Sequence, residues 1–260
     1  MKSFFFRLAV LATLIIPSIL SAQISINSSV FISENFNSIG GGAAASLPLN
    51  WKMSSAGTGS TANWATGTNI ITTTQAANSG TPTTGGAYNW ATPAGTDRAI
   101  GSMTDGGYAS PNSIMAFYRN TTGATVTTIT IRFSVERYRI NTSPSTLLFF
   151  SSADGSAWTA RTSGDISSGA FATGASSYTF TSPQTASRII TITGLSIPSN
   201  GDFYLRWLFT TGAANSQGLG LDDVMLYAGT ATPGILATMQ DAISIDNPPA
   251  GQTNPGDQLT

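Results

Sequence analysis

The chain of 260 residues contains no cysteine and no histidine, and charged residues make up only 9% of it. Without cysteine there is no disulfide and no thiol nucleophile, and without histidine there is no imidazole base for a serine nucleophile. Zinc sites usually need the same two residue types as ligands. Two carboxylates alone suffice for a glycosidase, but no motif singles out such a pair. We therefore expect a protein that is not an enzyme.

Basic residues are also scarce. Eleven Lys and Arg face twelve Asp and Glu, and the net charge is −1. Lys52 is the only lysine apart from Lys2. Nucleic-acid binding needs clustered Lys and Arg, so we expect no nucleic-acid partner. Many β-branched and turn-forming residues with little charge are typical of an extracellular all-β domain.

The N-terminus has the pattern of a targeting segment. Lys2 and Arg7 lie beside an aromatic start, an apolar run follows over Leu8–Ile19, and small residues come at the cleavage position. The run is short for a membrane span, although a retained anchor helix is an alternative. We predict a signal peptide over residues 1–22 and a secreted or cell-surface protein with no membrane span once the peptide is removed.

Short runs of alternating apolar and polar residues, separated by Gly, Ser, Asn or Pro, recur along the rest of the chain. A period of two predicts half-buried strands. The runs lie at Val30–Phe36, Asn69–Thr74, Ala99–Met103, Ser113–Arg119, Val126–Arg139, Thr146–Ser151, Ser177–Thr181, Arg188–Thr193, Asp202–Thr210 and Leu219–Tyr227. Ten short strands predict an antiparallel β-sandwich of the jelly-roll type over residues 23–228, with at most a turn or two of helix.

Aromatic residues divide into two groups in this interpretation. Trp158 and Trp207 fall on core-like rows, and the rows containing Phe133 and Trp207 should face one shared core. The segment 40–95 is expected to form extended loops with one or two strands. Five aromatic residues in loop-like stretches are candidates for stacking on sugar rings: Trp51, Trp64, Tyr88, Trp90 and Tyr108.

Two adjacent aspartates in the last predicted strand are the most unusual feature. Strand alternation places Asp222 in the row of Val224 and Leu226, and Asp223 in the row of Leu221 and Met225. An unpaired carboxylate beside an apolar row is costly, so each should meet a cation or hydrogen-bond donors.

Glu34 poses the same problem, because it shares a face with Ile32 and Phe36. The first and last strands of a jelly roll often pair, which would bring Glu34 near Asp222 and Asp223. We predict a structural Ca²⁺ site formed by these three carboxylates. The alternatives are an arginine partner or loop N–H groups. The candidate arginines are Arg98, Arg119 and Arg206.

Two further charged stretches have local interpretations. Glu136–Arg139, at the end of the strongest strand, is either a solvated edge or ion-pair ladder, or a site for an anionic sugar. Asp154 lies in a tight-turn sequence and should hydrogen-bond within its own turn.

Composition changes after Tyr227. Residues 229–236 are typical of a linker, Ala237–Ile245 is expected to form one strand, and Asn254–Asp257 a turn. We therefore expect an incomplete second unit over residues 237–260.

Several motifs, taken in order, resemble an N-terminal jelly-roll module of secreted bacterial surface proteins. This group includes laminin-G/concanavalin-like or MAM-like sandwiches and the choice-of-anchor and cleaved-adhesin domains. The matching stretches are Glu34–Phe36, Leu47–Trp51, Asp97–Ser102, Phe117–Gly123, Ser152–Trp158 and Gly220–Val224. The tail, with Asn254–Thr260, is similar to the start of an Ig-like conserved surface-protein repeat.

These resemblances imply a function in adhesion or in matrix or glycan association, without catalysis. The alternative they leave open is a carbohydrate-binding module accessory to a hydrolase or nuclease domain encoded beyond Thr260. An extracellular glycan or matrix component is the partner implied by both.

Overall fold

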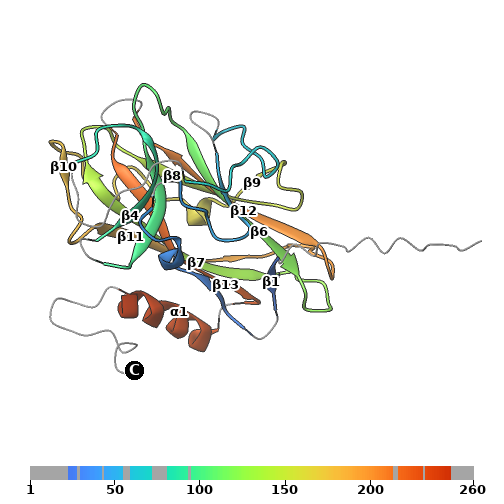
Figure 1. Cartoon of the computed structure of the whole chain (residues 1–260). Coiled ribbons are helices and arrows are strands. Elements are labelled where there is room, and N and C mark those ends of the chain that lie inside the picture. The colour runs from blue at the N-terminus through green and yellow to red at the C-terminus, as the bar shows by residue number, and fades with distance from the viewer. Residues whose placement is uncertain are drawn as a thin grey trace, which may run out of the picture.

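The computed structural model describes residues 23–27, 30–42, 44–54, 59–71, 81–92, 95–212, 216–230 and 232–246. Over these residues the chain forms two β-sheets and one α-helix (Figure 1). The predicted signal peptide lies outside them. No helix in the described part is long and apolar enough to span a membrane.

The sheets pack as a sandwich, as predicted. Sheet A has the order β1 (Ile24–Ile26), β6 (Asn112–Asn120), β12 (Asp202–Thr210), β8 (Thr146–Ser152) and β9 (Thr159–Ala160), with β3 (Trp51–Met53) also paired to β6. Sheet B has the order β10 (Ser177–Tyr178), β7 (Ile129–Ile140), β13 (Gly218–Ala228), β5 (Arg98–Met103) and β4 (Gly86–Ala91), with β11 (Gln184–Ile192) beside β7 and β2 (Ile32–Glu34) beside β13. Neighbouring strands run antiparallel, except that β1 runs parallel to β6. Two 3₁₀ turns, η1 (Asn37–Ile39) and η2 (Thr162–Gly164), complete the connections.

The main core lies between the two sheets. Phe133 on β7 and Trp207 on β12 are both fully buried and meet edge to face, with ring centroids 5.8 Å apart. Trp51 on β3 stacks on Trp207 at 5.6 Å. The predicted shared core is confirmed, but the prediction of Trp51 in a loop is wrong, because this ring fills the core beside Trp207.

A second apolar cluster covers the outer face of sheet B. Tyr88 and Trp90 alternate along β4 with core-facing residues, and Trp90 stacks on Tyr88 at 4.6 Å and on Tyr138 at 5.6 Å. Gly220 of β13 permits this packing, because a Cβ there would lie 3.0 Å from the Trp90 ring. Tyr88 and Trp90 are therefore buried strand residues, which corrects their assignment to loops.

The C-terminal part of the described chain forms a helix, α1 (Pro233–Asp246), below β7 and β13 in Figure 1. The strand expected at 237–245 is therefore wrong. The backbone oxygen of Thr232 accepts the Leu236 N–H at 2.9 Å, and Pro233 begins the helix, where its missing N–H costs nothing. Met239 is fully buried. The Ig-like unit stays a prediction, because residues 247–260 lie outside the described part.

Candidate functional site

The strand that carries the two aspartates contains a β-bulge. Asp222 on β13 lies opposite Ser134 on β7, whereas Met225 lies opposite Arg132. Three steps along β13 therefore match two along β7, which is the signature of one extra residue. Asp223 lies within the bulge and has a φ of 50°, in the left-handed region.

The bulge changes which face each side chain occupies. Leu221 and Val224, three residues apart, both contribute to the core between the sheets. Asp222 therefore points away from that core, to the outer face of sheet B. The prediction that Asp222 shares a row with Val224 is wrong, because regular alternation does not continue through a bulge.

On this outer face Asp222 joins two other carboxylates. Oxygens of Asp97, Glu136 and Asp222 all lie within 4.8 Å of one another. Asp222 and Glu136 are 2% and 3% exposed, and Asp97 is half-buried. Among the described residues this group includes neither Glu34 nor Asp223. The structure thus brings Asp222 together with two acids that the sequence analysis did not assign to the Ca²⁺ site.

The environment favours the neutral form of Asp222. Its pKa is raised well above the usual range, first by burial and then by the charges of Asp223, Glu136 and Asp97. One hydrogen bond acts in the opposite direction, because the Asp223 N–H donates to Asp222 Oδ1 at 2.6 Å. Two of the three carboxylates are buried, so keeping the whole group charged is unfavourable, and a proton or a cation at Asp222 would lower this cost.

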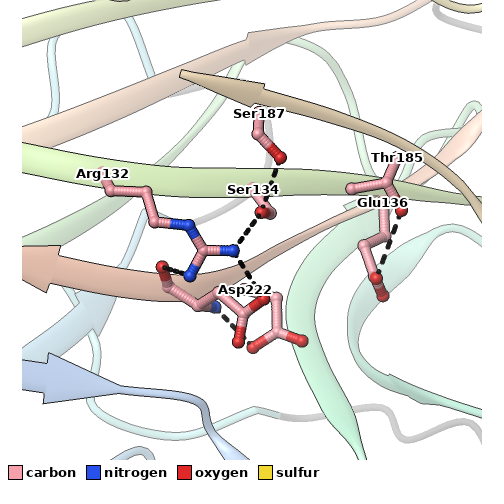
Figure 2. Close-up of polar contacts among 7 residues, drawn as sticks. Arg132, Ser134, Glu136, Thr185, Ser187 and Asp222 are labelled. Atoms are coloured by element: carbon pink, nitrogen blue, oxygen red, sulfur yellow. Dashed lines mark hydrogen bonds and ion pairs between the residues drawn. The ribbon is translucent and has the colours of Figure 1, made fainter. Parts of the chain in front are cut away.

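Glu136 is held by its neighbours within the sheet. The Tyr138 hydroxyl donates to Glu136. Figure 2 shows the Thr185 hydroxyl beside the same carboxylate, at 3.5 Å. Arg137 is only 5% exposed and donates to the Ala172 carbonyl at 2.6 Å. The solvated edge considered for Glu136–Arg139 is therefore wrong for Glu136 and Arg137, because both side chains are buried in sheet B, and Arg137 packs over the Phe171 ring on the face opposite to Glu136.

Asp223 has an arginine partner. Arg132 Nη2 lies 3.2 Å from Asp223 Oδ2, and Arg132 also donates to the Asp223 carbonyl and to Ser134 Oγ, each at 3.3 Å (Figure 2). The side chain of Arg132 is 2% exposed. Asp223 thus has the arginine partner that was the alternative to Ca²⁺. This partner is Arg132, which was not among the three candidate arginines.

Glu34 lies on the other side of the sheet. β2 pairs with β13 as expected, and Glu34 lies directly opposite Val224, whose side chain faces the core. Residues directly opposite share a face, so sheet B separates Glu34 from Asp222. Glu34 Oε1 accepts the Phe36 N–H at 2.7 Å, while burial raises the pKa of Glu34. Glu34, Asp222 and Asp223 therefore do not form one site, which corrects the prediction from the sequence. Ca²⁺ binding itself stays a prediction.

The outer face of sheet A carries an aromatic cluster of a different kind. Phe117 on β6 stacks on Tyr204 of β12 with centroids 4.8 Å apart, and Trp64 leans on both rings at 5.7 and 5.8 Å. Trp64 and Phe117 remain half-buried. Of the five aromatic residues proposed as sugar platforms, Trp51 and Trp64 line a groove on this face, where Trp51 is 1% exposed and Trp64 is half-buried.

This groove, which we call the β3 groove, has a volume of about 440 Å³. It is lined by Leu47, Pro48, Leu49, Asn50, Trp51, Lys52, Trp64, Asn69 and Phe117. Leu49 is 59% exposed. Lys52 Nζ donates to the Trp64 carbonyl at 3.0 Å and lies 4.6 Å from the centre of its ring. Apolar walls, two asparagines and one cation are the composition usual for small-molecule sites.

Two neighbouring rings already pack on an arginine of the protein. The Arg206 guanidinium lies between Phe150 and Trp158, at 4.4 and 4.8 Å from the ring centres, and donates to the Ala62 carbonyl at 3.3 Å. Burial lowers the pKa of Arg206 to about 10. Trp158 was expected in the core, but it is half-buried here and packs on an arginine.

The turn after β8 behaves as predicted. Asp154 Oδ1 accepts the N–H groups of Ser156 and Ala157, each at 2.8 Å, and the Ser152 hydroxyl at 2.9 Å. These bonds hold the pKa of Asp154 well below its usual range. Asp154 therefore shapes its own turn.

No family model and no curated protein matches the chain. Among solved structures it is similar to the K2 cleaved adhesin domain of Lys-gingipain, at 16% identity and a TM-score of 0.42, covering 77% of this chain and 99% of that one. It is also similar to the carbohydrate-binding module TmCBM61 in complex with β-1,4-galactotriose, at 9% identity and a TM-score of 0.29, covering 78% and 91%. A third likeness is the N-terminal cellulose-binding domain of a Cellulomonas fimi β-1,4-glucanase, at 13% identity and a TM-score of 0.33, covering 75% and 98%. Similarity at this level carries no functional conclusion.

Proposed function

We propose that this chain is a secreted, non-catalytic module that binds a glycan in adhesion or matrix association, and that the glycan occupies the β3 groove. The observation that carries the proposal is the pair of half-buried rings, Trp64 and Phe117, in the wall of a groove. The apolar face of a pyranose ring packs well on such aromatic surfaces.

The remainder of the groove suits a ligand with many hydroxyls. Asn50 and Asn69 line it, and asparagine side chains both donate and accept hydrogen bonds. A volume of about 440 Å³ is in the range of small-ligand sites and accommodates one or two sugar rings. The groove is framed by β3 and the segments next to it, so the ligand surface is preformed.

The distribution of acids supports a binding role over a hydrolytic one. The described residues that line the β3 groove include no Asp or Glu, whereas a glycosidase needs a pair flanking the scissile bond. The carboxylates that do gather, Asp97, Glu136 and Asp222, lie on sheet B, and two of the three are fully buried. A sugar cannot enter between them.

Binding of extracellular polysaccharides, measured by affinity electrophoresis and on a glycan array, tests the proposal. Trp64→Ala should abolish retardation, because it removes the ring while the main-chain bonds of residue 64 to Gly155 and Lys52 remain possible. Leu148→Ala is the control, since Leu148 is exposed on the same face of sheet A outside the groove. If Trp64→Ala binds as well as the unchanged protein, the β3 groove is not the site.

The Ca²⁺ prediction carries over to Asp97, Glu136 and Asp222 as a structural proposal. Ca²⁺ prefers carboxylate oxygens and would neutralise the repulsion within this buried group. Because the group lies on sheet B, we propose that the ion would stabilise the sandwich and take no part in ligand contact.

A further inference from the structure

Lys52 is an isolated cation in the wall of the β3 groove. Outside the predicted signal peptide it is the only lysine of the chain. Within the described part of the chain it forms no ion pair, in contrast to Arg119 and Arg132, which pair with Asp202 and Asp223 at 2.7 and 3.2 Å. Among the described residues, no carboxylate forms an ion pair with Lys52.

The ammonium group of Lys52 is held in place but is not saturated. Nζ donates one hydrogen bond to the protein, to the Trp64 carbonyl at 3.0 Å, and lies over the Trp64 ring at 4.6 Å. An ammonium has three N–H donors, so two remain for a ligand or for water. Because Trp64 orients the group, Lys52 loses less conformational freedom on binding an anion than a free surface lysine would.

The charges of the residues that line the groove also favour an anionic ligand. The described residues in its lining comprise one cation and no carboxylate. A neutral sugar entering this groove would leave the ammonium partly desolvated without a counter-charge, whereas an anionic sugar would supply one. The stem of Lys52 meanwhile adds apolar surface beside the rings.

We propose that the β3 groove selects an acidic glycan, whose carboxylate or sulfate group contacts Lys52 Nζ while the sugar ring packs against Trp64 and Phe117. This inference rests on the proposed glycan-binding function of the same groove. It adds the chemical class of the ligand and the residue that distinguishes that class from neutral sugars.

The test compares matched oligosaccharides by isothermal titration calorimetry at two salt concentrations. Oligogalacturonate is compared with neutral oligogalactose, and a sulfated oligosaccharide with its desulfated form, which separates the carboxylate source from the sulfate source. The variants are Lys52→Met, which keeps the length of the stem, and Lys52→Arg, which keeps the charge. Arg161→Gln is the control, because it removes one positive charge outside the groove.

The expected result is that Lys52→Met weakens binding of one anionic probe at least tenfold, about 1.4 kcal/mol, and leaves the neutral counterpart within twofold. Lys52→Arg should restore most of the affinity, and the salt dependence should diminish in Lys52→Met. Equal losses for anionic and neutral probes would mean that Lys52 only positions Trp64, and would overturn the inference. An equal loss in Arg161→Gln would show non-specific attraction and overturn it as well.

Two further outcomes separate this inference from the proposal on which it rests. If neutral oligosaccharides bind through Trp64 and anionic ones bind no better, the selectivity for acidic glycans is wrong while the glycan-binding function stands. If no oligosaccharide binds, both are wrong.

Discussion

Replacing Asp222 by asparagine should make the protein more stable at neutral pH when no divalent cation is present. Asparagine has nearly the same shape and can keep the hydrogen bond from the Asp223 N–H at 2.6 Å, but it carries no charge near Asp97 and Glu136. The folded protein then no longer has to hold a buried carboxylate beside like charges.

The pH dependence gives the magnitude and the sign. Burial and the neighbouring charges raise the pKa of Asp222 in the folded state, while the unfolded chain keeps a value near 3.9. A raised folded pKa contributes stability that is fully present below the unfolded pKa and is lost as the pH rises through the folded pKa. The slope between the two values is about 1.4 kcal/mol per pH unit for one proton. From pH 5 to pH 7, Asp222→Asn should therefore gain up to about 2.7 kcal/mol relative to the unchanged protein.

With Ca²⁺ in excess, the unchanged protein should be more stable than Asp222→Asn. A bound ion displaces the proton and raises the free energy of unfolding by about 2.7 kcal/mol at a hundredfold excess over its dissociation constant. For a chain of this size that corresponds to a rise of roughly 5 to 11 °C in the melting temperature. Asp222→Asn should lose this response.

The assay is urea denaturation of both proteins at pH 5, 6 and 7, in EDTA and in excess Ca²⁺. The argument about the buried carboxylate is refuted if the two proteins show parallel pH profiles in EDTA. The metal proposal alone is refuted if Ca²⁺ leaves the unchanged protein unaffected while the difference in EDTA persists. Asp154→Asn serves as a control, because Asp154 is hydrogen-bonded within its own turn and its pKa is lowered.

Two predictions concern packing. Trp207→Ala, in the core between Phe133 and Trp51, should lower the free energy of unfolding by about 3 kcal/mol or more through a cavity, and a loss under 1 kcal/mol in urea denaturation would contradict the shared core. Met239→Ala should lower the free energy of unfolding by about 2 kcal/mol, because Met239 is fully buried in α1. Gln240→Ala, at an exposed position, should change it by under about 0.5 kcal/mol. Equal effects of the two substitutions would show that α1 does not pack on the sandwich.

Strands with a long row of large apolar residues at every second position were accessible from the sequence. Asp202–Thr210 was predicted with the bounds that β12 has, because large apolar residues alternate along it without interruption. Strand β4 is short and has only Tyr88 and Trp90 as large residues, beside Ala87, Asn89 and Ala91, so its sequence shows no long apolar row and the two rings resembled loop aromatics.

The candidate site could be predicted only in part. The two aspartates marked the correct strand, and the pairing of β2 with β13 followed from the fold. The bulge at Asp223 was not visible in the sequence, because it arises from the pairing with β7, and it changed the face of Asp222. Asp97 and Glu136 come from distant parts of the chain and meet Asp222 only after sheet B has formed.

The start of α1 was, in contrast, marked in the sequence. Threonine followed by proline is a common helix start, and Ile235 and Met239 are four residues apart on one face. No feature of the sequence indicated that Trp64 and Phe117 lie side by side in the β3 groove. Trp64 lies beside Phe117 because its N–H donates to the carbonyl of Gly155, in the turn after β8.

The two sheets differ in how much sequence change they can tolerate. Along β13, Gly220 lies against Trp90 on one face while Leu221 fills the core on the other, so substitutions there disturb one packed layer or the other. Four side chains of the β3 groove, Leu49, Lys52, Trp64 and Asn69, are exposed or half-buried, and their replacement leaves the interior intact. Among descendants of this chain, diversification of ligand preference should therefore concentrate at these four positions, while the core-facing Leu47 and Trp51 and sheet B change slowly.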